Sequence, residues 1–239
     1  AGQRAPENTL AAFRLGAQHG YRAFECDVKL SADGVPFLLH DATLERNTSG
    51  QGTASGRDWK ALSRLEAGAW HSPPFAGETL PTLDAIAAWL IRNDHSLDLE
   101  IKPTPGDEAR TGQVVATAAA RLWAGHPHRL LLSSFRPEAL QAARVAAPEL
   151  PRALLVDSDW PGWFAVAQDL GCVAVIANHR LLDAALIQRL HVQGLRALAY
   201  TVNEATDAQR LRAAGIDGLI TDAVDRFDPA AVRDDRASS

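Results

Sequence analysis

Amphipathic segments of the chain repeatedly end at a glycine that leads directly into a short apolar run. The four junctions lie at Gly20, Gly171, Gly194 and Gly215. A glycine just past the end of a helix adopts the left-handed conformation that closes the last helical turn. Short runs that are apolar at nearly every position are typical of strands covered on both faces. The pattern therefore predicts repeated βα units on a parallel sheet.

The apolar runs after these glycines predict four strands, over 21–28, 172–178, 195–202 and 216–222. Four more predicted strands cover 35–40, 96–101, 129–134 and 152–156. An opening helix over about 8–19 also needs a strand before it, which raises the count to nine. We assign the excess to the segment ECDVKLSADGVPFLLH, where a short Asp-Gly turn leaves no room for a crossover helix.

These elements predict an α/β fold, a (β/α)8 barrel of the TIM type with an irregular second-to-third strand region. A doubly wound open sheet is the alternative. Residues 41–81 break the rhythm of strands and helices and are rich in Gly, Ser and Thr, so we expect an insertion there. The chain is expected to form a single domain over 1–239 that ends in a polar tail over 228–239.

The composition of the chain argues against nucleic acid and against membrane insertion. The net charge of -5 and the pI near 5.9 argue against nucleic acid, because no strong basic field meets a phosphate backbone. No apolar run reaches the ~18 residues of a membrane-spanning helix, so no stable membrane insertion is expected. Two cysteines in a chain of this length favour a reducing compartment, and we expect a cytoplasmic location. A homo-oligomer is compatible with these properties.

Charged side chains interrupt two of the predicted strands near their carboxyl ends. Side chains two residues apart on a strand share a face, so Glu25 and Asp27 point the same way, as do Glu100 and Lys102. Barrel enzymes carry their active sites at this end of the strands. Three carboxylates make a set of hard oxygen ligands that suits Mg²⁺ or Ca²⁺. His40 ends the next strand, where it could transfer a proton. Each of these residues taken alone is also compatible with a solvated or ion-paired surface position.

Eight motifs in order along nearly the whole chain resemble those of the glycerophosphodiester phosphodiesterases, and of the bacterial cytosolic type in particular. They are APENTLAAF, FECDVKLSADGVPFLLHD, TLERNTSGQG, LEAGAWHSPPFAGETLPTL, LEIKP, SSF, AYTVN and GIDGLITD. The resemblance implies a phospholipase C-like phosphodiesterase barrel with a small insertion. It also implies hydrolysis of a small-molecule glycerophosphodiester, such as glycerophosphocholine or glycerophosphoethanolamine, to sn-glycerol 3-phosphate and an alcohol. One divalent cation, Mg²⁺ or Ca²⁺, is the implied cofactor.

The resemblance assigns roles to the residues that match the family's motifs. Glu25, Asp27 and Glu100 match its metal ligands. His40 matches one of two catalytic histidines, and Lys102 matches a lysine that faces the phosphate. Two imidazoles would divide the proton transfers: one removes a proton from the nucleophile and the other protonates the leaving alkoxide. Water and the glycerol 2-hydroxyl both remain open as the nucleophile.

Three aromatic residues are weaker candidates for substrate binding. We expect Trp70 and Phe75 of the insertion to wall the glycerol pocket or, equally, to pack the insertion on the barrel. Tyr200 stands where the family often has Trp. The family also has His-Arg-Gly at the end of the first strand, so we expect the second histidine and a phosphate-binding arginine just before Ala1. The absence of methionine agrees with a longer natural product.

Two other functions remain open from the sequence. A related barrel phosphodiesterase could act on another lipid head group, as a lysophospholipase D or a cyclising lyase. A barrel without the His-Arg-Gly segment would be a non-catalytic ligand-binding protein.

Overall fold

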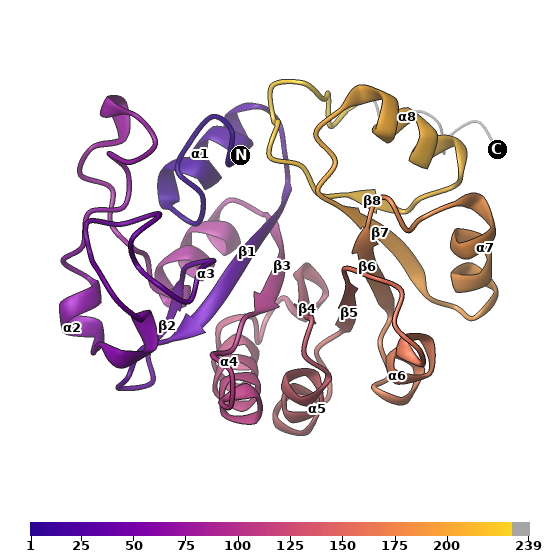
Figure 1. Ribbon diagram of the computed structural model, residues 1–239, viewed down its shortest axis with the longest axis horizontal. Helices are drawn as coiled ribbons and strands as arrows, with labels where there is room; N and C mark the ends of the chain where they lie inside the picture. The colour runs from indigo at the N-terminus through magenta and orange to yellow at the C-terminus, as the bar shows by residue number, and fades with distance from the viewer. Residues whose placement is uncertain (231–239) are drawn as a thin grey trace.

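A computed structural model describes residues 1–230 of the chain, and its centre is one curled eight-stranded sheet (Figure 1). The strands are β1 (Ala23–Leu30), β2 (Pro36–Leu38), β3 (Ser96–Ile101), β4 (Leu130–Ser134), β5 (Arg152–Val156), β6 (Ala174–Asn178), β7 (Arg196–Tyr200) and β8 (Gly218–Leu219). Their order in the sheet is β2-β1-β3-β4-β5-β6-β7-β8. All neighbours are parallel except β1 and β2, which pair antiparallel.

Helices connect the parallel strands and cover the outer side of the curl (Figure 1). The α-helices are α1 (Leu10–Gln18), α2 (Trp59–Leu62), α3 (Leu83–Arg92), α4 (Glu108–Leu122), α5 (Pro137–Ala146), α6 (Trp163–Asp169), α7 (Ala184–Val192) and α8 (Ala205–Ala213). Short 3-10 helices occupy Ala54–Gly56, Pro73–Phe75 and Pro127–Arg129. The strand order follows the chain from β3 to β8, whereas a doubly wound sheet reverses direction at a switch point. The predicted barrel-type α/β architecture is therefore confirmed over the doubly wound alternative.

The strands, the opening helix and the hairpin that the glycines and the short turn predict are present in the structure. All eight predicted strands and the opening helix are present, with ends that differ by a few residues. The four glycines at the helix–strand junctions all have positive φ, between 63° and 88°. The segment around Asp33 and Gly34 is an antiparallel hairpin in which Leu30 pairs with Pro36.

The ninth strand, expected before Ala1, stays a prediction. Within the described residues β8 pairs with β7 alone, so no hydrogen-bonded ladder joins β8 to β1.

Two apolar layers between sheet and helices hold the fold together. One packs β1, β3 and β4 against α3, α4 and α5 and contains the fully buried Trp123. The other packs β5, β6 and β7 against α6, α7 and α8. Alternate residues of β1, β3, β4, β5, β6 and β7 belong to these layers, so the residues between them face the inside of the curl.

The stretch expected as an insertion, 41–81, has its own small core over β2. It gathers Phe37, Leu39, Leu44, Ala54, Leu62, Ala67 and Leu80. In the described part of the chain, no helix has the length and apolar character to cross a membrane. The polar tail expected over 228–239 falls mostly outside the described residues.

Candidate active site

Strands β1 and β3 place three carboxylates side by side, with Glu25 and Asp27 inside β1 and Glu100 near the carboxyl end of β3. The two strands are parallel neighbours in a register that pairs Asp27 with Glu100. Strand alternation turns Glu25, Asp27 and Glu100 to the inside of the curl, whereas Cys26 and Leu99 are buried on the helix side. One oxygen from each carboxylate lies within 4.8 Å of the others. The register of one strand pair thus builds the cluster that the sequence pattern predicts.

Lys102 supplies the positive charge of this cluster. Its ammonium donates to Asp27 Oδ1 at 2.9 Å and lies 3.2 Å from Glu100 Oε1. Burial works against the ammonium charge, but the carboxylates of Asp27 and Glu100 outweigh it and raise the pKa of Lys102. Lys102 therefore stays cationic and holds two of the three carboxylates.

The ammonium of Lys102 does not balance the three acids of the cluster. Burial and the neighbouring charge of Asp27 raise the pKa of Glu25 well above its ordinary range. The same two causes raise the pKa of Glu100 to about 8. Burial also opposes the charge of Asp27, but Lys102, His40 and a hydrogen bond from Asn8 outweigh it and lower the pKa. Among the described residues, none hydrogen-bonds the Glu25 carboxylate. A divalent cation fits this donor set in charge and in ligand type.

Asn8 fixes the orientation of Asp27. Its Nδ2 donates to Asp27 Oδ2 at 2.8 Å, and its Oδ1 accepts from the Asp27 backbone N–H at 3.0 Å. Asn8 has a φ of 58°, in the left-handed region that Asn adopts more readily than most residues. The motif APENTLAAF alone does not single out Asn8. Thr9 is the N-cap of α1, whereas its neighbour Asn8 bonds the acidic cluster.

Asp98 is a second polar residue of the cavity that the sequence motifs do not single out. It lies two residues before Glu100 on β3, so the same alternation turns it inward and could have identified it. Ser133 Oγ donates to Asp98 Oδ1 at 2.7 Å, and within the described residues Oδ2 has no hydrogen-bond partner. Burial raises the pKa of Asp98 to about 7, against the hydrogen bond from Ser133, which lowers it.

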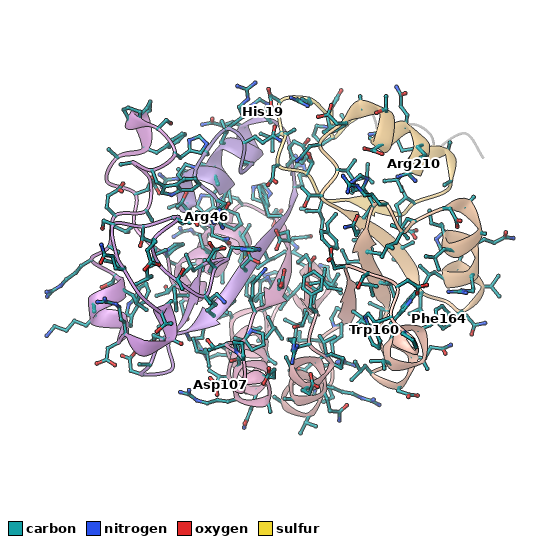
Figure 2. All side chains as sticks on the ribbon, viewed as in Figure 1. His19, Arg46, Asp107, Trp160, Phe164 and Arg210 are labelled. Atoms are coloured by element: carbon teal, nitrogen blue, oxygen red, sulfur yellow. The ribbon has the colours of Figure 1, made fainter. Side chains whose placement is uncertain are left out.

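His40 belongs to a polar network at the mouth of the barrel. Its Nδ1 lies 2.7 Å from Asp41 Oδ1. Arg46 donates to both oxygens of Asp41, through Nε at 2.6 Å and Nη2 at 2.8 Å. The same guanidinium donates to both oxygens of Glu7, at 2.7 Å and 3.1 Å. Figure 2 shows Arg46 on the side of the molecule formed by the N-terminal third of the chain.

A cavity of about 1050 Å³ joins these groups. Its lining includes the three clustered carboxylates, Lys102, His40 and Asn8. Tyr200 lines the same cavity: its hydroxyl donates to Asp157 Oδ1 at 3.0 Å, and its ring packs edge-on against Phe135. The arrangement brings the imidazole of His40, the ammonium of Lys102 and the acidic cluster to one open space.

Trp70 and Phe75 are not among the residues that line this cavity. Both rings pack edge-on against His71 within the insertion, and the Trp70 indole N–H donates to the Ala67 carbonyl at 2.9 Å. Of the two roles that the sequence left open, the arrangement agrees with packing of the insertion.

Known proteins are similar to this chain over most of its length. The sequence model of the Glycerophosphoryl diester phosphodiesterase family matches residues 1–226. YhdW of Bacillus subtilis is 31% identical over 229 residues, which cover 91% of this chain and 89% of YhdW. A glycerophosphodiester phosphodiesterase of Caldanaerobacter subterraneus subsp. tengcongensis is 28% identical over 221 residues, which cover 91% of this chain and 88% of that protein.

The fold has solved counterparts with the same assignment. A phosphodiesterase of Oleispira antarctica, solved in complex with the product sn-glycerol-3-phosphate, superimposes with a TM-score of 0.88 and 32% identity. The superposition covers 97% of this chain and 93% of that one. Matches of this length and identity mean that the chain belongs to the glycerophosphoryl diester phosphodiesterase family and is a phosphodiester hydrolase.

Proposed function

We propose that this protein hydrolyses small glycerophosphodiesters to sn-glycerol 3-phosphate and an alcohol, with one divalent cation held by Glu25, Asp27 and Glu100. The observation that carries the proposal is the convergence of these three carboxylates within 4.8 Å, in a cavity that His40 and Lys102 also line. The product bound to the Oleispira antarctica relative supports the choice of substrate. The cation, when bound, supplies positive charge that stabilises the phosphate as negative charge builds on its oxygens.

The residues around the cluster prepare it for this task. Asn8 bonds both the side chain and the backbone of Asp27, so the carboxylate keeps one orientation. Lys102 keeps the Asp27 and Glu100 carboxylates together against their repulsion. Its ammonium then shares the negative charge of the phosphate, because an ammonium has three donors and two of them engage carboxylates.

His40 is the proton-transfer group in this proposal. Cleavage forms a bond from the nucleophile to phosphorus and breaks the bond from phosphorus to the alcohol oxygen. One proton leaves the nucleophile and one reaches the leaving oxygen, and His40 carries one of these two transfers. The resemblance to the family implies a second imidazole for the other transfer.

The test is release of glycerol 3-phosphate from glycerophosphocholine and glycerophosphoethanolamine by the full-length protein, before and after treatment with EDTA. We expect release that EDTA abolishes and that added Mg²⁺ or Ca²⁺ restores. Activity that chelation leaves unchanged would contradict the cation assignment.

Product analysis separates the remaining alternatives. A cyclic glycerophosphate identifies the glycerol 2-hydroxyl as the nucleophile. Cleavage of a lysophospholipid without cleavage of glycerophosphocholine would favour the lysophospholipase D alternative. Binding without turnover, in a protein whose natural N-terminus lacks His-Arg-Gly, would favour the ligand-binding alternative.

A further inference from the structure

The imidazole of His40 lies at the exposed mouth of the cavity, where packing alone does not hold it. Its side chain is 48% exposed. An imidazole that transfers a proton must keep one ring nitrogen directed at the substrate and the other nitrogen in a fixed protonation state. A group outside the apolar core must therefore hold the ring of His40.

Asp41 is the residue in contact with the other ring nitrogen. Its Oδ1 lies 2.7 Å from His40 Nδ1. The hydrogen bonds from Arg46 hold the pKa of Asp41 well below its usual range, so Asp41 is a carboxylate and only accepts hydrogen bonds. The proton between the two groups must then belong to Nδ1, so Nε2 is the ring nitrogen that can exchange a proton with the substrate. The contact fixes the tautomer as well as the position of the ring.

Arg46 in turn fixes the Asp41 carboxylate. Two donors of its planar guanidinium reach the two oxygens of Asp41, so the carboxylate group does not rotate freely. The adjacent edge of the guanidinium, Nη1 and Nη2, makes a second two-point contact, with Glu7. Exposed ion pairs of this kind contribute little to stability, but planar two-point contacts define orientation well.

The network ends beside the acidic cluster. Glu7 immediately precedes Asn8, whose side chain bonds Asp27. One two-residue segment before α1 therefore contacts both the network that reaches His40 and a carboxylate of the proposed cation site. This connection sets the imidazole at a constant place relative to the carboxylates.

We propose that Asp41 is the positioning residue that fixes the orientation and tautomer of His40. Arg46 holds Asp41 in place by two hydrogen bonds, and Glu7 in turn holds Arg46. The inference rests on the proposed function, because it assigns Asp41 a role in the same phosphodiester cleavage. Glu7, Asp41 and Arg46 line the same cavity, and in this proposal they act on the reaction through the imidazole of His40.

The first test measures turnover of glycerophosphocholine by Asp41→Asn, His40→Ala and the double variant of the full-length protein. A proton-transfer group contributes roughly 10²–10⁴ to rate, so we expect Asp41→Asn to lower kcat by at least about tenfold with KM nearly unchanged. In the His40→Ala background, Asp41→Asn should add no further loss. A normal kcat in Asp41→Asn, or an equal loss in both backgrounds, would overturn the proposal.

The second test reads the imidazole directly, without turnover. The ¹⁵N shifts of His40 should show one tautomer, with the proton on Nδ1, in the wild type and a mixture in Asp41→Asn. The same single tautomer in both proteins would contradict the role of Asp41. If Asp41→Asn does not fold, Glu7→Gln tests the same network one contact further away, with a smaller loss of kcat that also disappears in the His40→Ala background.

A matched ion pair controls for the loss of a surface charge. Asp84 of α3 accepts from Arg121 of α4 at 2.8 Å, and neither residue lines the cavity. Asp84→Asn should keep the wild-type kcat. The outcomes also separate the two proposals: a wild type that releases no glycerol 3-phosphate refutes the proposed function, whereas an impaired His40→Ala beside a normal Asp41→Asn refutes only the positioning role.

Discussion

At the scale of single residues, the site depends on which carboxylates carry a proton. Glu25 and Glu100 have raised pKa values, whereas Asp27 has a lowered one because Lys102 and Asn8 contact it. Three chemically similar side chains within one small volume therefore differ because their immediate neighbours differ. A cation that binds here must displace protons from the two glutamates, which makes its binding stronger as pH rises.

The change Glu100→Gln tests the role of this carboxylate. Glutamine keeps the size of the side chain but removes the charge and one strong oxygen ligand. We expect kcat to fall by roughly 100-fold or more, with loss of response to added cation, since changes even outside the ligand set cost roughly 10–100-fold in metal affinity or activity. Assays over a titration of Mg²⁺ and of Ca²⁺ measure both effects.

Asp98→Asn is the matched control for that variant. It removes a carboxylate from the same face of β3, but Asp98 bonds Ser133 and does not belong to the cluster. The response to added cation should persist in this variant. Near-normal activity of Glu100→Gln would remove Glu100 from the proposed cation site.

At the scale of elements, helix packing on the outside supports the strands that carry the site. α4 and α5 touch at Gly112, where an added Cβ would lie 2.2 Å from the carbonyl oxygen of Ala139. The two helices therefore approach more closely than any side chain at position 112 would allow. α4 follows β3 and α5 follows β4, so this contact holds together two adjacent βα units.

We expect Gly112→Ala to destabilise the protein, although alanine favours helix formation by about 1 kcal/mol. The added methyl group meets a backbone carbonyl, and overpacking of this kind costs about 1–3 kcal/mol. Thermal unfolding should show a Tm lower by roughly 2–8 °C. Gly125→Ala is the control, because an added Cβ there meets nothing within 4 Å. An unchanged Tm in Gly112→Ala would mean that the helices separate at little cost.

At the scale of the whole molecule, the curled sheet concentrates negative charge in one cavity. Burial and Asp27 raise the pKa of Glu100 from its ordinary value of 4.5 to about 8. Between these values the folded protein keeps a proton that the unfolded chain loses. The folded state then binds more protons, so the free energy of unfolding decreases as pH rises through this window.

This charge predicts how metal-free stability depends on pH. After EDTA treatment, the Tm should decrease between about pH 5 and about pH 8, and the decrease should be smaller in Glu100→Gln, which lacks the titrating group. Added Mg²⁺ or Ca²⁺ should raise the Tm of the wild type most at the upper end of this range. Equal slopes for the two proteins would show that Glu100 does not carry this dependence.

Some features of this protein follow from local sequence alone. The glycines after helices predict the βα units because only a left-handed residue closes those helical turns. The short turn at Asp33 and Gly34 predicts the antiparallel hairpin because no crossover fits between its strands. Alternation along β1 and β3 predicts which carboxylates share a face. Each of these signals depends on residues close together in the chain.

Tertiary structure decided what those residues contact. The parallel register of β1 with β3 sets Asp27 beside Glu100, 73 positions apart in the sequence, and places Lys102 on both. The folding of the insertion sets Arg46 between Asp41 and Glu7, and it turns Trp70 and Phe75 toward His71. Local periodicity tells which face a side chain occupies, but distant contacts depend on the packing of whole elements, which no single segment specifies.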